Sequence, residues 1–296
     1  MFSGLSAFPL TPMNESSIDE SAFLRLISNL VAHKVDSIGV LGSTGSYAYL
    51  SIQERMRIAK IAIEQAQEVP VIVGIGAMRT RDVLTLAEDA QKAGADALLL
   101  APVSYQKLSD DEVFILYETV TRFLSIPLCV YDNPATTHFI FSDELHVRIA
   151  QLPKIGSIKL PPLPADPQAA RLKIEQLRQR IPAHVSLGIS GDAFALQGLQ
   201  AGCDAWYSVI AGLFPVATQK IIDAFKAQNT DEARRLSEHL EPLWAMFKQY
   251  GSIRVVATSA ELLGLVEHPC LPLPIHSLGG KAREKLEGIL KTLQLM

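Results

Sequence analysis

The chain has 296 residues, of which 48% are hydrophobic and 20% charged, a balance typical of a globular protein with a large core. Its net charge of −4, without a Lys/Arg-rich stripe, argues against nucleic acid or an anionic membrane surface as a partner. Three widely spaced cysteines, Cys129, Cys203 and Cys270, form neither a disulfide framework nor a CxxC metal site. We find no secretion signal and no apolar run long enough to span a membrane, so we expect a soluble, cytoplasmic protein.

Short apolar runs alternate with longer amphipathic runs along the first three quarters of the chain. The expected strands are Gly4–Phe8, Ser37–Gly42, Val71–Gly76, Ala97–Pro102, Leu128–Pro134, Ile155–Pro161, Ser186–Gly191 and Ala205–Gly212. The expected helices are Ser21–Ala32, Ile52–Gln67, Thr80–Ala93, Asp110–Leu124, Ser142–Ala150, Pro167–Ile181, Ala193–Ala201 and Phe214–Lys226. The strand runs are almost wholly apolar, as in parallel sheets that are covered on both faces.

Eight such units predict an α/β fold, a TIM (β/α)8 barrel, over residues 1–225. An open doubly wound sheet is the alternative, but it usually has a Gly-rich phosphate loop after its first strand, and GLSAFPLTP contains none. Three further helical patterns follow, at Thr230–Tyr250, Ile253–Leu263 and Ser277–Leu295. They predict a C-terminal helical domain at residues 226–296 that packs on the barrel or on a neighbouring subunit.

Lys159 is the most informative polar residue, because it ends an apolar strand run, Ile155–Ile158. Reactive groups of such barrels lie at the carboxyl ends of the strands. A lysine in an apolar barrel wall is costly unless it is neutral or paired, and desolvation favours the neutral amine, a nucleophile toward carbonyls. The alternative is a lysine just beyond the strand that reaches solvent.

Tyr131 ends the preceding strand run, so its phenol could reach the Lys159 amine and transfer protons during imine chemistry. The alternative is a core tyrosine that bonds a backbone group. The segment Gly42–Ser46, GSTGS, offers backbone N–H groups and hydroxyls that would suit a substrate carboxylate, although an ordinary polar turn fits equally. Tyr105, in PVSYQK, could extend a hydroxyl relay or merely cover the barrel mouth.

Small and polar residues also end the seventh and eighth expected strands, where they could leave space for a ligand. These are Gly188, Ser190 and Ser208, together with Asp192, which could equally be a helix N-cap. A metal mechanism has little support, because the seven histidines form no HxH or HxxxH pair, and only His138 lies near the expected mouth. We therefore expect neither a metal nor a diffusible cofactor.

In this order, GSTGS (42–46), YDNP (131–134), SIKLP (157–161) and SGD (190–192) resemble the motifs of the dihydrodipicolinate synthase/N-acetylneuraminate lyase family of class I Schiff-base aldolases. The resemblance covers nearly the whole chain. It implies a TIM barrel with a C-terminal helical domain, assembled as a homotetramer, a dimer of dimers. It also implies that Lys159 forms an imine with pyruvate or another 2-oxo acid, which the loop at Ser43 and Thr44 holds by its carboxylate.

The same resemblance assigns Tyr131 as general acid/base and Thr44 as its link to Tyr105, which reaches across a subunit boundary in many members. Two positions depart from the family. Thr136 replaces the arginine with which dihydrodipicolinate synthases grip the aldehyde substrate, and His138 replaces a glycine. A hydroxyl cannot substitute for a bidentate carboxylate clamp. We expect both residues to face the second substrate.

These departures favour a carbon–carbon lyase that acts on a hydroxylated 2-oxo acid. The alternatives within the enzyme class are 4-hydroxy-tetrahydrodipicolinate synthase proper, of lysine biosynthesis, and a sugar-acid dehydratase that uses the same imine. The alternative outside it is a catalytically idle protein that binds a 2-oxo acid.

Overall fold

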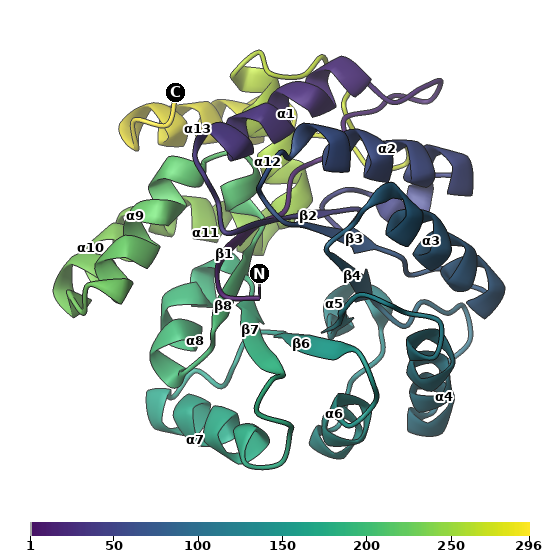
Figure 1. Ribbon diagram of the computed structural model, residues 1–296. Helices are drawn as coiled ribbons and strands as arrows, with labels where there is room; N and C mark the ends of the chain where they lie inside the picture. Colours follow the sequence, from purple (N-terminus) through teal and green to yellow (C-terminus); the bar gives the residue numbers. More distant parts are fainter. Residues whose placement is uncertain (1) are drawn as a thin grey trace.

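The computed structural model describes residues 2–296 and contains a closed, parallel, eight-stranded barrel in the order β1-β2-β3-β4-β5-β6-β7-β8 (Figure 1). The strands are β1 Gly4–Ala7, β2 Ser37–Val40, β3 Val71–Gly74, β4 Ala97–Leu100, β5 Leu128–Tyr131, β6 Ile155–Leu160, β7 Ser186–Ser190 and β8 Ala205–Ser208. β1 pairs with both β2 and β8, which closes the sheet. The predicted TIM barrel is therefore confirmed, and the open doubly wound sheet is excluded.

A ring of helices surrounds the barrel (Figure 1). These are α1 Glu20–Ala32, α2 Ile52–Gln65, α3 Thr80–Ala93, α4 Asp110–Thr121, α6 Asp143–Ala150, α7 Pro167–Arg178, α8 Ala195–Ala201 and α9 Pro215–Lys226. The single-turn helix α5 Pro134–Thr137 lies inside this ring, directly after β5 (Figure 1). Capping boxes start α2 at Ser51 and α4 at Ser109, and the Asp166 side chain caps α7 ahead of Pro167. Three 3₁₀ turns also occur, η1 Tyr47–Tyr49, η2 Asp192–Phe194 and η3 Ile210–Gly212.

The C-terminal part is helical, as expected, but it has one more helix than the pattern indicated. Its helices are α10 Thr230–His239, α11 Glu241–Tyr250, α12 Ser252–Leu262 and α13 Gly280–Thr292. The single helix expected at Thr230–Tyr250 was wrong, because Pro242 lies in the first turn of α11 and cannot continue α10. In Figure 1, α12 and α13 lie beside α1, at the same side of the barrel as the chain's purple N-terminal segment.

A buried carboxylate ties the C-terminal helices together. Glu261 on α12 accepts hydrogen bonds from Arg283 at 2.6 Å and Ser277 at 2.8 Å, and pairs with His268 at 3.0 Å. Although burial opposes ionisation, these partners lower the pKa of Glu261. The helical part is thus fixed by an ion-pair cluster as well as by apolar packing. No helix in the described part of the chain is long and apolar enough to cross a membrane.

Candidate active site

The Lys159 side chain lies inside the barrel. Lys159 stands next to the end of β6, where it pairs in the ladder with Tyr131, the last residue of β5. Only 4% of Lys159 is exposed, so the alternative of a lysine that reaches bulk solvent is excluded. Strand register therefore places an amine and a phenol side by side at the carboxyl-terminal end of the barrel, as the strand pattern predicted.

Three aromatic rings surround the amine. Lys159 Nζ lies 3.9 Å from the ring centroid of Phe8, 4.3 Å from that of Tyr131 and 5.5 Å from that of Tyr207. Two glycines leave space for these rings. A Cβ at Gly39 would lie 2.3 Å from Phe8 Cζ, and a Cβ at Gly188 would lie 2.2 Å from Tyr207 Cε2. The rings offer π faces to a cation but no acceptor with which the nitrogen could form an ion pair.

Lys159 has no counter-ion. Within residues 2–296, no carboxylate comes within 4.0 Å of its nitrogen, whereas exposed lysines such as Lys60 and Lys226 have acidic partners. Burial in apolar surroundings opposes a localised charge, and the rings offset only part of that cost. The site therefore holds an amine that is buried, unpaired and next to a proton-carrying phenol, which is what nucleophilic attack on a carbonyl requires.

The Tyr131 phenol is held by two side chains. Its oxygen is 2.9 Å from Ser43 Oγ and accepts a hydrogen bond of 2.8 Å from Asn133 Nδ2. Ser43 belongs to the loop that follows β2, and Asn133 lies two residues beyond the end of β5. The alternative of a core tyrosine that bonds only the backbone is therefore excluded. The prediction did not include Asn133, although it lies inside the YDNP motif and its amide could have suggested a partner.

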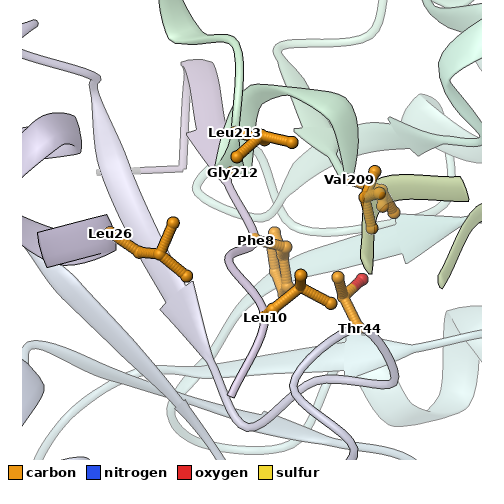
Figure 2. Close-up of a pocket in the computed structure, with 8 residues that line it drawn as sticks. Phe8, Leu10, Leu26, Thr44, Val209, Gly212 and Leu213 are labelled. Atoms are coloured by element: carbon orange, nitrogen blue, oxygen red, sulfur yellow. The ribbon is translucent and has the colours of Figure 1, made fainter. Parts of the chain in front are cut away.

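The link to Tyr131 is made by Ser43 rather than by Thr44, which corrects the expectation from the family resemblance. Figure 2 shows the Thr44 side chain beside Phe8 and Leu10, in a tightly packed and mainly apolar recess. The other lining residues come from α1, η3, α12 and the end of β8: Leu26, Val209, Gly212, Leu213 and Val256. Ser43 and Thr44 belong to a tight turn, in which the Ser46 N–H donates to the Ser43 carbonyl at 3.1 Å, and in this conformation only the Ser43 hydroxyl is within hydrogen-bond distance of the phenol.

A second tyrosine and a buried arginine lie behind this loop. Arg55 donates to the carbonyls of Gly74 at 2.9 Å and Gly76 at 2.8 Å, and its guanidinium lies 5.1 Å from the Tyr47 ring centroid. Burial lowers the pKa of Arg55 to about 10. Burial, and then proximity to Tyr131, raise the pKa of Tyr47 to about 12, so this phenol stays protonated at neutral pH. Neither residue was predicted, since neither lies in a recognisable motif.

The segment after Tyr131 is anchored to the protein on its inner side. The Asp132 N–H donates to the Lys159 carbonyl, and its carboxylate lies 3.2 Å from His146 Nε2 in a buried pair. On the outer side, Thr136 and His138 are exposed, and His138 ends α5 in the left-handed region at φ 58°. These two residues are thus accessible at the rim, where a second substrate would approach, but they do not contact Lys159 directly.

Tyr105 is 88% exposed, in the loop between β4 and α4, and makes no hydrogen bond to Tyr131 within the described chain. Tyr49 and Met78 are also large, exposed apolar residues, and they follow β2 and β3, so they share this end of the barrel with Tyr105. Within one chain, the relay predicted through Tyr105 is therefore incomplete.

The polar residues at the ends of β7 and β8 form hydrogen bonds within the protein. Ser190 donates to the Leu160 carbonyl, and Ser208 donates to Asp192 at 2.7 Å. Asp192 is not a helix N-cap. Its buried carboxylate also accepts from Trp206 Nε1 at 3.0 Å and from the N–H of Ile210 at 3.2 Å. Burial nevertheless raises the pKa of Asp192.

Ligand binding by Ser208, Ser190 and Gly188 therefore stays a prediction, which the contacts within this chain do not favour. Ser208 is fully buried and already bonded, and the space beside Gly188 is filled by Tyr207. Over residues 2–296, no three His, Cys, Asp or Glu side chains gather closely enough to hold a metal ion.

An eight-stranded barrel that buries a lysine amine and a phenol at the carboxyl ends of adjacent strands has the framework of a TIM-barrel enzyme. A model of the dihydrodipicolinate synthetase family matches residues 1–293. The chain is 31% identical to 4-hydroxy-tetrahydrodipicolinate synthase of Pelobacter propionicus, with all of both sequences covered. The chain thus belongs to the dihydrodipicolinate synthetase family, and it is an enzyme of the lyase/aldolase type.

Solved structures agree. A dihydrodipicolinate synthase from Agrobacterium tumefaciens superposes with a TM-score of 0.95 at 44% identity, over 99% of this chain and 98% of that one. The dihydrodipicolinate synthase of Acinetobacter baumannii, a chloride-inhibited enzyme solved with pyruvate, has a TM-score of 0.91 at 25% identity over the whole of both chains.

Proposed function

We propose that Lys159 captures the ketone carbon of a 2-oxo acid, pyruvate in the first instance, as a Schiff base. The observation that carries this proposal is the geometry of Lys159, a buried amine without a carboxylate partner and paired in register with Tyr131. The pyruvate complex of the Acinetobacter baumannii relative supports pyruvate as the ligand. The loop at Ser43 and Thr44 would hold the carboxylate through its backbone N–H groups.

The chemistry then follows from the two side chains. The neutral amine adds to the ketone to give a carbinolamine, and Tyr131 delivers the proton with which hydroxide leaves as water. The resulting protonated imine withdraws electrons, so the neighbouring carbon can lose a proton, or break a carbon–carbon bond, to give the enamine. In the reverse of carbon–carbon cleavage, the enamine adds to an aldehyde. Hydrolysis of the imine then releases the product and restores the amine of Lys159.

Mass spectrometry after borohydride reduction tests this function. Wild-type protein treated with pyruvate and borohydride should gain the mass of one reduced pyruvate adduct, located at Lys159 by peptide mapping. Lys159→Ala should gain none, and Lys60→Ala, which removes an exposed lysine that pairs with Glu64, should still react. Wild-type protein that remains unmodified would refute the Schiff base.

We propose that the second substrate carries hydroxyl groups and has no carboxylate that an arginine would have to bind through two hydrogen bonds. Thr136, in the place of the family's arginine, is exposed at the rim beside His138, and both can hydrogen-bond to a hydroxyl. Pyruvate release from a panel of hydroxylated 2-oxo acids, compared with condensation of pyruvate and aspartate semialdehyde, separates this lyase from the lysine-biosynthetic synthase. Adduct formation without turnover of any compound would indicate the idle protein.

We also propose a cytoplasmic homotetramer, a dimer of dimers in which Tyr105 of one chain completes the relay of another. The exposed apolar side chains at the rim, Tyr49, Met78 and Tyr105, support a second copy as the partner, because such patches on soluble proteins favour association. Light scattering should give four times the 32.3 kDa chain mass. Tyr105→Ala should lower activity without changing the fold, and a monomeric, fully active wild type would refute the proposal.

A further inference from the structure

The Asn133 side chain contacts the Tyr131 phenol and has no role in the function proposed above. Its Nδ2 donates to the Tyr131 oxygen at 2.8 Å, on the same oxygen that Ser43 approaches to 2.9 Å. An amide N–H can only donate, whereas a hydroxyl can donate or accept. The phenol oxygen must therefore accept from Asn133, and the phenol proton cannot point toward that side.

The backbone around Asn133 is held firmly enough for this contact to be directional. Its carbonyl accepts from Thr137 Oγ1 at 3.0 Å and from the N–H groups of Thr136 and Thr137 at 3.1 and 3.0 Å. The preceding residue, Asp132, is bonded to the Lys159 carbonyl and paired with buried His146. The amide is thus anchored by α5 on one side and by β6 on the other, so it can hold the phenol in one orientation.

We infer that Asn133 is a positioning residue. It directs the Tyr131 proton away from the rim, toward Ser43 and toward the imine that Lys159 forms with the 2-oxo acid. The inference rests on the proposed Schiff base and adds a second group that acts through the phenol. With the amide donating, the proton has two remaining directions, the Ser43 hydroxyl or the bound 2-oxo acid. Both lie on the path that proton transfer during imine and enamine formation requires.

NMR in D2O can monitor the exchange of the pyruvate methyl protons for deuterium. This exchange reports proton transfer between the imine and the enamine alone, and it needs no second substrate. Asn133→Ala should slow exchange roughly tenfold, since the phenol loses its orientation. Asn133→Asp has the same shape, but its carboxylate only accepts and draws the phenol proton toward itself, so exchange should fall further at neutral pH. Exchange by this variant should partly recover as the pH approaches about 4, because a protonated carboxyl donates again.

Thr137→Val is the matched control, because it removes one hydrogen bond to the Asn133 carbonyl but keeps the two backbone N–H groups, of Thr136 and Thr137, that hold this carbonyl and the amide in place. It should exchange within about twofold of wild type, and borohydride adduct yields should stay near wild type in all three variants. Wild-type exchange by both Asn133 variants, or an equal loss in Thr137→Val, would overturn the positioning role while leaving the Schiff base intact. A wild type that forms no adduct would instead overturn the proposed function and this role with it.

Discussion

The ends of β5 and β6 and the ends of β7 and β8 carry similar polar residues, yet the structure uses them in opposite ways. At β5 and β6, Lys159 Nζ lies against aromatic rings with no carboxylate within 4.0 Å among residues 2–296, and the Tyr131 hydroxyl contacts Ser43 and Asn133. At β7 and β8, Asp192 accepts from three donors, and Ser208 donates to Asp192 while accepting from the N–H of Ala211. The amine at the first pair of strand ends is thus left without an acidic partner, whereas the polar side chains at the second pair bond to one another or to the backbone.

This difference shows that position on a barrel rim does not by itself make a residue functional. A buried polar group is costly until it is hydrogen-bonded, so a fully satisfied carboxylate such as Asp192 stabilises the fold and offers nothing to a ligand. A buried amine without a partner costs stability, and a protein that retains one does so for its reactivity. The predictions below test this contrast between the two halves of the rim.

The largest effect is expected from removing single hydroxyls on the two sides. Tyr131→Phe should slow exchange of the pyruvate methyl protons by about 10²- to 10⁴-fold, because it removes the general acid/base. Ser208→Ala should stay within about threefold of wild type and lose only about 1 kcal/mol of stability. NMR exchange and urea unfolding of both variants measure these quantities. A large loss of exchange in folded Ser208→Ala would erase the contrast.

The sequence predicted the barrel and the neighbouring positions of Tyr131 and Lys159 because both depend on short-range patterns. Apolar runs separated by amphipathic runs set the strand order, and that order brings Tyr131 and Lys159 together. What could not be predicted depends on side-chain direction and on contacts between distant segments. Ser43 and Thr44 both offer a hydroxyl in GSTGS, and only the loop conformation decides which hydroxyl contacts the Tyr131 phenol.

The same reason explains why the sequence did not indicate the contacts at the ends of β7 and β8 or the aromatic rings around Lys159. Gly188 suggests space, but Tyr207, nineteen positions later, fills that space. Phe8 reaches Lys159 from the residue that follows β1, across the barrel interior. Such contacts depend on closure of the barrel and leave no mark in the local sequence.

Asp192→Asn should destabilise the fold by about 2 kcal/mol at pH 5. Asp192 Oδ2 accepts a hydrogen bond from the N–H of Ile210, and in the variant an amide NH2, which is itself a donor, would face this N–H. Burial raises the pKa of Asp192 in the folded protein above 3.8, so the folded state binds this proton more tightly than the unfolded chain. The contribution of Asp192 to stability is therefore fully present below about pH 4 and declines as the pH rises through the folded pKa.

The stability difference between wild type and Asp192→Asn should accordingly shrink with rising pH, which urea unfolding at several pH values measures. Borohydride adducts of the folded variant should equal those of wild type, since this half of the rim does not touch the amine. A difference that grows with pH would contradict the raised pKa.

Gly188→Ala sharpens the comparison at the boundary between the two halves. The new Cβ would lie 2.2 Å from Tyr207 Cε2, so the ring must move, and overpacking of this kind costs about 1–3 kcal/mol. Because Tyr207 also faces Lys159, the rate of adduct formation should fall as well. Gly288→Ala is the matched control. Its Cβ meets nothing within 4 Å on α13, and it should raise stability by up to about 1 kcal/mol. Equal stability changes in the two variants would argue against a filled space beside Gly188.

The smallest effect concerns the thiols and tests whether the interior beneath Lys159 is open to solvent. Burial raises the pKa of Cys129 to about 11 and that of Cys203 to about 12, and it also raises the pKa of Cys270. Only the thiolate attacks a disulfide reagent, so none of the three should react within minutes at pH 8 in the native protein, and all three should react in denaturant. Cys129 Sγ lies 3.6 Å from the Tyr207 hydroxyl, in the barrel interior. Peptide mapping would locate any rapid labelling of Cys129 in the native protein. Such labelling would show that solvent reaches the rings around the Lys159 amine. The amine would then not lie in apolar surroundings, and the contrast with the tightly packed ends of β7 and β8 would no longer hold.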